Sequence, residues 1–112
     1  MELEAGLKTK IQEQIQSKDV FLFMKGNPDF PMCGFSSTAS AILKHCGVEF
    51  SHCNVLEDED IREGIKAYSN WPTIPQLYIK NEFVGGCDIM KEMAESGELL
   101  ELLNTRGINI EI

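Results

Sequence analysis

Basic residues are scarce in this sequence, with ten Lys and Arg against eighteen Asp and Glu and a formal net charge of −8. Nucleic-acid binding requires a basic face that neutralises phosphates, so this deficit argues against a nucleic-acid partner. Long apolar runs are also missing, and none approaches the ~20 residues of a membrane span. The first residues, Met1 to Glu4, lack the basic region and apolar core of a secretory signal. We therefore expect a protein that engages neither nucleic acid nor membrane.

Cysteine is sparse and dispersed, at positions 33, 46, 53 and 87. No Cys-x-x-Cys pair occurs, and the spacing is not that of a disulfide-rich secreted scaffold. A structural zinc site is also disfavoured, because such sites usually contain a close pair of ligands. The thiols are therefore expected to be free in a reducing compartment. A bacterial cytoplasm is favoured, with the mitochondrial matrix or the eukaryotic cytosol as alternatives.

The chain of 112 residues fits one compact domain, so residues 1–112 are treated as a single unit. Apolar residues spaced by four from Leu3 predict a helix that ends near Ser17. The run Val20–Met24 predicts a strand buried on both faces. The other expected elements are a helix over 34–47, a strand over Val48–Val55, a helix after Glu57–Asp60, a hairpin of Gln76–Ile79 with Phe83–Val84, and a helix from Asp88 to about Asn104.

This order of elements predicts an α/β fold with a four-stranded mixed sheet and helices on both faces. Asp88 is expected to cap the last helix, which should bend near Ser96-Gly97. The tail from Thr105 has little periodicity and receives no assignment.

Cys33 directly follows the first strand and its loop and directly precedes a helix. Free backbone N–H groups and the helix dipole favour an anion there, so the thiolate form should be stabilised, and Lys25 would add positive charge. Gly34 would let a ligand approach the backbone. Ser36 occupies the position of the second thiol in a Cys-x-x-Cys motif, so any redox cycle needs a sulfur from elsewhere. A buried, inert cysteine is the alternative interpretation.

Four blocks of sequence carry a resemblance to a known family. They are Lys25, Pro31–Ser36 (Pro-Met-Cys-Gly-Phe-Ser), Asn70–Leu77 (Asn-Trp-Pro-Thr-Ile-Pro-Gln-Leu) and Val84–Ile89 (Val-Gly-Gly-Cys-Asp-Ile). In order and spacing, they resemble the monothiol glutaredoxins with a Cys-Gly-Phe-Ser motif, over roughly residues 5 to 104.

This resemblance implies a thioredoxin-like (glutaredoxin) fold, glutathione binding and a 2Fe-2S cluster. The cluster would bridge a homodimer, with Cys33 and one glutathione thiolate from each protomer as ligands. The implied function is iron–sulfur cluster assembly and transfer within iron and redox homeostasis, with BolA-type proteins and iron–sulfur acceptor proteins as partners. The alternative is a glutathione-dependent thiol–disulfide oxidoreductase working by a monothiol mechanism. We favour the function of cluster carrier and expect at most weak oxidoreductase activity. The loop from Lys25 to Cys33 is long, and the resemblance implies that this length shifts bound glutathione away from the position needed for attack on its sulfur.

The resemblance also implies a glutathione site around Cys33. Its expected members are Lys25, Arg62, Thr73, Ile74, Pro75, Gly86, Cys87 and Asp88. Pro75 would be cis and face Cys33, and the backbone of Ile74 would pair with the cysteinyl part of glutathione. Asp88 would accept from the γ-glutamyl ammonium, and Lys25 with Arg62 would hold the glycyl carboxylate. From the sequence alone, the Gly85-Gly86 segment is equally well explained as a tight turn.

The remaining thiols and the single tryptophan have simpler interpretations. Cys46 and Cys53 are expected to be core residues, and Trp71 a packing residue. Cys87 remains open between lining the ligand site and forming a regulatory disulfide.

Overall fold

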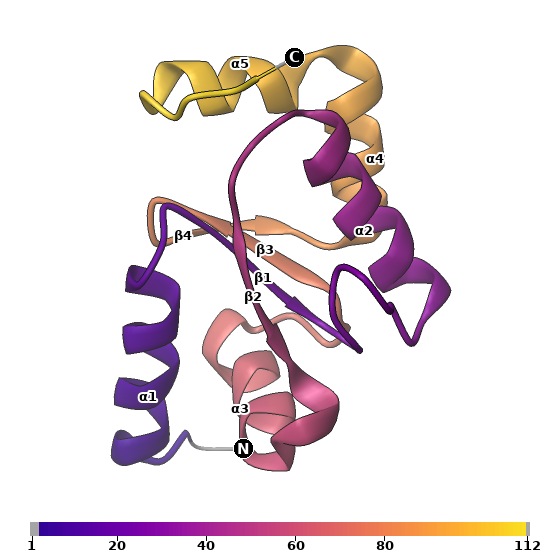
Figure 1. Cartoon of the computed structure of the whole chain (residues 1–112). Coiled ribbons are helices and arrows are strands. Elements are labelled where there is room, and N and C mark those ends of the chain that lie inside the picture. The colour runs from indigo at the N-terminus through magenta and orange to yellow at the C-terminus, as the bar shows by residue number, and fades with distance from the viewer. Residues whose placement is uncertain (1–2, 112) are drawn as a thin grey trace.

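The computed structural model describes residues 3–111, which form a mixed sheet between two layers of helices (Figure 1). In chain order the elements are α1 (Ala5–Gln16), β1 (Val20–Met24), α2 (Gly34–His45), β2 (Ser51–Asn54), the 3₁₀ helix η1 (Val55–Glu57), α3 (Glu59–Ser69), β3 (Gln76–Ile79), β4 (Glu82–Gly85), α4 (Cys87–Ser96) and α5 (Glu98–Thr105). The strand order is β2-β1-β3-β4. Strands β1 and β2 are parallel, and the pairs β1–β3 and β3–β4 are antiparallel. The predicted α/β architecture is confirmed.

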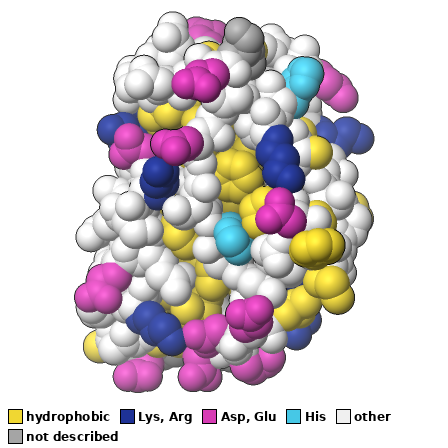
Figure 2. All heavy atoms as spheres, in the orientation of Figure 1, with side chains coloured by type: hydrophobic (Ala, Val, Ile, Leu, Met, Phe, Trp, Pro, Cys, Tyr) yellow, Lys and Arg dark blue, Asp and Glu magenta, His cyan; other side chains and the backbone are white. Residues whose placement is uncertain are grey.

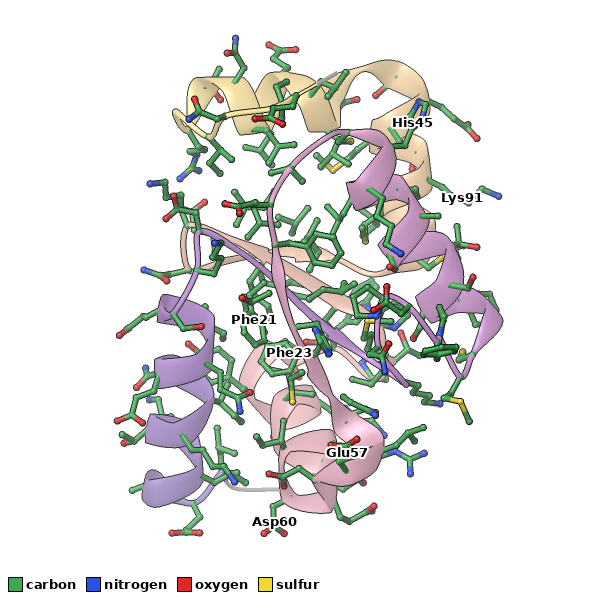
Figure 3. The ribbon with its side chains drawn as sticks, viewed as in Figure 1. Phe21, Phe23, His45, Glu57, Asp60 and Lys91 are labelled. Atoms are coloured by element: carbon green, nitrogen blue, oxygen red, sulfur yellow. The ribbon has the colours of Figure 1, made fainter. Side chains whose placement is uncertain are left out.

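Strand β1 lies at the centre of the molecule and is buried along its whole length. Val20, Leu22 and Met24 belong to the core under α2, α4 and α5. Phe21 and Phe23 belong to a second core under α1 and α3, and Figure 3 shows both rings on that side. Each fully buried side chain of this size stabilises the fold by about 1.5–3 kcal/mol. The prediction of a strand with two buried faces is confirmed.

The expected strand Val48–Val55 was too long at both ends, since β2 contains only Ser51–Asn54. Its four residues pair with Phe21 to Met24, so the length of the short strand β1 limits it. Val48 bridges instead to Ile110 in the tail. Val55 begins a 3₁₀ turn, in which the Asn54 side chain accepts from the Leu56 amide.

Helix α3, which later supplies part of the site, is held against α1 by a close contact and an ion pair. Gly64 has no side chain, and a Cβ built there would lie 2.7 Å from Leu7 Cδ2. Lys10 Nζ lies 2.8 Å from Asp58 Oδ2, while Asp58 Oδ1 accepts from the Ile61 amide at the start of α3. The hydrogen bond from Lys10 holds the pKa of Asp58 below its ordinary value.

The start of α4 differs from the start that the sequence predicted. The predicted cap at Asp88 is wrong, because α4 begins at Cys87 with Gly86 as its N-cap and no capping side chain. The β4–α4 connection is so tight that the N-cap lies two residues earlier than the sequence pattern suggested, which leaves the Asp88 carboxylate in the first turn. The predicted bend is confirmed at Gly97, between α4 and α5. Within residues 3–111, no helix has the length and apolar character to cross a bilayer.

The C-terminal tail, which received no assignment from the sequence, packs back onto the end of α2. Glu111 N–H donates to Gly47 O at 2.8 Å, next to the bridge between Val48 and Ile110. Gly47 has φ +69°, and a Cβ there would collide with the Glu111 carbonyl oxygen. Glycine is therefore required both by the backbone conformation and by the tail that crosses it.

We expect Gly47→Ala to destabilise the protein more than Gly107→Ala. Both glycines have a left-handed backbone, but nothing lies within 4 Å of a Cβ at Gly107. The Gly107 variant should lose about 1–2 kcal/mol from backbone strain alone. The Gly47 variant should lose roughly 1 kcal/mol more, because the tail hydrogen bond is displaced. Urea denaturation measures both losses, and equal values would show that the tail contributes nothing.

Candidate functional site

The loop between β1 and α2 (residues 25–33) delivers Cys33 to the start of α2, where it is the N-cap. Backbone hydrogen bonds fold the loop on itself, with Met32 N–H donating to Lys25 O at 2.9 Å. Lys44 Nζ donates to Pro28 O at 2.6 Å and fixes the loop against α2. The cysteine is therefore carried by an ordered loop and not by a free connection.

The environment of Cys33 favours its thiolate. The Cys33 sulfur accepts no capping hydrogen bond from α2. The backbone N–H groups close to it nevertheless lower the pKa of the thiol. The Ser36 N–H has the largest effect, and the Phe35 N–H and the Lys25 charge add to it, while partial burial opposes them. The expected stabilisation by a helix N-terminus is therefore present, and the nearby amides exceed Lys25 in their effect.

A cavity of about 440 Å³ opens beside Cys33. This volume is within the ~300–1,000 Å³ typical of small-molecule sites. The lining residues come from the β1–α2 loop and the start of α2, from α3 and the segment before β3, and from the start of α4. They are Lys25, Cys33, Phe35, Lys66, Trp71, Pro72, Thr73, Ile74, Pro75, Gly86, Cys87, Asp88 and Ile89.

The cavity brings together every residue expected from the sequence except Arg62. Arg62 lies on α3, where its guanidinium is 3.9 Å from Glu59 and its Nε is buried without a partner among residues 3–111. One helical turn later, Lys66 lines the cavity and forms a 3.1 Å ion pair with Glu63. The second cation at the cavity wall is therefore Lys66, which the sequence interpretation missed.

The segment before β3 meets the start of α4 at Gly86. The Ile74–Pro75 bond is cis, as the family resemblance implied. A Cβ built on Gly86 would lie 3.2 Å from Pro75 O and 3.3 Å from Trp71 Nε1. The chain itself therefore approaches this glycine closely. Trp71 packs on Phe83, with ring centroids 5.8 Å apart, and also forms part of the cavity wall.

The first turn of α4 presents an anion and an anion-binding backbone to the same cavity. Asp88 is exposed, and within residues 3–111 its carboxylate has no hydrogen-bond or ion-pair partner. Because the first N–H groups of a helix lack acceptors within the helix, the start of α4 also favours a ligand carboxylate. Lys25 and Lys66 supply positive charge from other walls. The site is suited to a small ligand that carries both carboxylate and ammonium groups.

The other three thiols differ from Cys33. Cys87 lines the cavity, but its pKa is raised, first by burial, then by Asp88 and in part by the Cys33 charge. Cys46 is buried, as expected. The expectation for Cys53 was wrong in part: it is only half-buried, because β2 is an edge strand, although burial still raises its pKa to about 11. Among the four thiols, Cys33 is the one whose pKa is lowered.

A second, larger hollow of about 810 Å³ lies between α2, the α4–α5 pair and the tail. Its one thiol is Cys46, whose pKa burial raises. The smaller cavity is therefore the candidate site, because a stabilised thiolate, cations and a helix N-terminus meet there.

The comparisons with known proteins agree with this geometry. The family model described as Glutaredoxin matches residues 20–84. The protein named monothiol glutaredoxin-5, mitochondrial, of Saccharomyces cerevisiae is 52% identical over 106 residues, which cover 92% of this chain and 71% of that protein. The chain belongs to the monothiol glutaredoxin family.

A chloroplastic monothiol glutaredoxin, S14 of Arabidopsis thaliana, is 56% identical over 99 residues, covering 88% of this chain and 57% of that protein. This chain therefore spans little more than half the length of the plant relative. Among solved structures, a monomeric truncated mutant of Trypanosoma brucei 1-C-Grx1 superposes with a TM-score of 0.85 at 44% identity, covering 94% of this chain and 96% of that one. The glutaredoxin fold, a thioredoxin-like fold, is thereby confirmed.

Some wall residues of this monothiol glutaredoxin had no role in the sequence interpretation. Phe35 lines the cavity, yet its side chain is 64% exposed. Phe30 and Met32, which lie in the loop before it and outside the cavity wall, are 74% and 68% exposed. Figure 2 shows hydrophobic side chains protruding at the edge of the molecule where α2 begins. Lys66 had one available signal, since it follows Arg62 by four residues and so shares its helix face.

We expect Cys33 to be alkylated by iodoacetamide at lower pH than Cys87. Only the thiolate reacts, and the pKa of Cys33 is lowered while that of Cys87 is raised. The labelling rate of each cysteine, followed by peptide mass spectrometry between pH 5 and pH 10, gives the two midpoints. A Cys33 midpoint at or above that of Cys87 would contradict the electrostatic account.

Proposed function

We propose that this monothiol glutaredoxin binds glutathione beside Cys33 and, as a pair of protomers, carries a 2Fe-2S cluster to acceptor proteins. Three observations together support the proposal. The Cys33 thiolate is stabilised, a serine stands in place of a second active-site thiol, and the cavity is lined by both positively and negatively charged side chains. In this proposal the second sulfur comes from a bound small thiol.

Glutathione matches the groups at the cavity wall. Its carboxylates have Lys25, Lys66 and the N-terminus of α4 as partners, and its ammonium has Asp88. The peptide backbone at Ile74, next to Pro75, offers the pairing an extended ligand needs. Arg62, one turn before Lys66, remains a proposed outer cation at the glycyl end.

In this proposal the cluster is transferred and is not a resident cofactor. The metal ligands that one chain offers fit a cluster bound between two protomers. Within residues 3–111, no group of three or more His, Cys, Asp or Glu side chains is arranged to hold a metal ion. Cys33 supplies one soft, partly exposed thiolate, the ligand type iron–sulfur clusters take. The remaining ligands are proposed to be the second protomer's cysteine and two glutathione thiolates. Glutathione is not part of the protein chain, so its thiolates dissociate more readily than protein thiolates.

The proposed role is cluster assembly and transfer in iron and redox homeostasis. BolA-type proteins and iron–sulfur acceptors are the proposed partners, and a bacterial cytoplasm, mitochondrial matrix or eukaryotic cytosol the proposed compartments. The partly exposed Cys33 thiolate also supports a second, weaker function as an oxidoreductase. There Cys33 would attack the glutathione sulfur of a mixed disulfide and release the other thiol, and a second glutathione would then release glutathione disulfide and restore Cys33.

Anaerobic reconstitution with iron, sulfide and glutathione should give visible charge-transfer absorption and a dimer by analytical ultracentrifugation. Cys33→Ser should abolish both signals, because it removes the protein's thiolate ligand. Cys87→Ser serves as the matched control, since it removes a thiol of the same cavity whose pKa is raised, and it should retain both. Failure of the wild type to form either signal, together with rapid turnover on a small glutathione mixed disulfide, would favour the oxidoreductase.

Glutathione binding should depend more on Lys66 than on Arg62. We expect Lys66→Gln to weaken binding about three- to tenfold, because it removes a charged partner of the ligand carboxylate. Arg62→Gln should have a smaller effect, and Lys8→Gln, an equal charge change on the exposed surface of α1, none. Titration of the ¹⁵N-labelled, reduced variants with glutathione by NMR gives the affinities. A larger loss for Arg62→Gln would move the carboxylate site to Arg62.

A further inference from the structure

Asn54, the last residue of β2, has a side chain that joins two segments of the chain. Its Oδ1 accepts the Gly26 N–H at 2.9 Å and the Leu56 N–H at 3.0 Å. Its Nδ2 donates to Glu57 Oε1 at 3.3 Å. Gly26 belongs to the β1–α2 loop, whereas Leu56 and Glu57 belong to η1. The side chain therefore ties the loop that carries Cys33 to the end of β2.

The bond to Gly26 continues the sheet beyond its last backbone pair. The parallel ladder between β1 and β2 ends with Met24 opposite Asn54. Gly26 lies two residues further along and is buried, so its N–H needs an acceptor within the protein. The Asn54 side chain supplies that acceptor at the point where β2 gives way to η1. An aliphatic side chain at position 54 would leave the buried N–H without this partner.

This anchor lies at the neck of the loop, where its two sides meet. Gly26 forms an antiparallel bridge with Pro31. Beside this bridge, Met32 N–H donates to Lys25 O at 2.9 Å. Lys25 lines the cavity, and Met32 directly precedes Cys33. The residues that Asn54 holds are therefore the immediate neighbours of two members of the site.

The neck is packed tightly enough to move as one unit. Gly26 has φ +86°, and a Cβ built there would lie 2.5 Å from Phe30 O and 2.6 Å from Met32 N. The outgoing and returning sides of the loop are thus in direct contact. A displacement of Gly26 away from Asn54 would therefore carry both Lys25 and Cys33 with it.

We propose that Asn54 is a positioning residue for the candidate site, which holds the neck of the β1–α2 loop so that Lys25 and Cys33 stay at the cavity. The cavity wall does not include Asn54, so this side chain acts through the loop and does not touch the ligand. Because glutathione serves as the probe of the site, this inference rests on the proposed function. The anchoring itself requires neither glutathione nor a cluster.

The test compares hydrogen exchange and glutathione affinity by NMR in reduced variants, each first checked for folding by circular dichroism. Asn54→Ala should speed exchange of the Gly26 N–H about five- to tenfold and weaken glutathione binding about three- to tenfold. Asn54→Asp should restore most of both, because it keeps an oxygen acceptor at the same place. Glu57→Ala should change neither, since it removes only the partner of Nδ2.

A general loss of stability is separated by Gly107→Ala, whose expected backbone strain lies after α5 and outside the cavity wall. This variant should bind glutathione like the wild type. Unchanged affinity or unchanged Gly26 exchange in Asn54→Ala would overturn the proposal, as would an equal loss of affinity in Gly107→Ala. A wild-type chain that does not bind glutathione would contradict the proposed function instead, and the Gly26 exchange rates would then decide the role of Asn54.

A second measurement uses the wild-type chain and does not depend on any variant folding. If the anchored loop binds glutathione more tightly, linkage requires that bound glutathione stabilises the anchored loop by the same factor. Saturating glutathione should therefore slow exchange of the Gly26 N–H about three- to tenfold. The Leu56 N–H, which bonds to the same oxygen but lies outside the loop, should slow less. No slowing at Gly26, or equal slowing at both amides, would contradict a positioning role.

Discussion

Burial of β1 on both faces is the constraint on which the rest of the structure depends. Its alternate side chains enter two separate cores, so the strand can neither slide by one residue nor rotate without exposing one set. The residues that follow it therefore leave the sheet at a fixed place and in a fixed direction. Lys25 and the ordered loop after it begin there, and that loop ends at Cys33.

The chemistry at Cys33 depends on short distances and not on the charge of the whole chain. A net charge of −8 disfavours one further anion. The amides of the first turn of α2 and the Lys25 charge act at close range, and they lower the pKa of Cys33 nonetheless. Charges across the molecule are screened by salt beyond about 10 Å, so the nearest groups decide the protonation state.

The cavity exists because three connections meet at one end of the sheet. The β1–α2 loop brings the thiolate, the segment before β3 brings the cis proline, and the tight turn into α4 brings Asp88. Gly86 allows the second and third of these to touch. The resulting site has charged walls, one thiol with a lowered pKa at Cys33 and a second thiol at Cys87 whose pKa is raised.

The sequence alone determined those features of the protein that depend only on residues close together in the chain. The apolar run of β1, the helix after Cys33 and the absence of a second cysteine at position 36 require only neighbouring residues to interpret. The family resemblance named eight residues around Cys33, and all of them except Arg62 line the cavity. Boundaries were less predictable: β2 is shortened by the length of its partner strand, and Gly86 takes the capping position expected for Asp88.

The tertiary structure decided what depends on distant segments meeting. Only the packing of α3 against the sheet shows that Lys66 lines the cavity, since both cations share one helix face in the sequence. The return of the tail adds a second requirement for glycine at position 47, beside its left-handed backbone. The hydrogen bond from the Lys25 N–H to the buried Ser36 Oγ likewise forms only because the end of β1 lies against the start of α2. Local patterns set secondary structure and reactivity, whereas contacts between segments far apart in sequence set which side chains share a site.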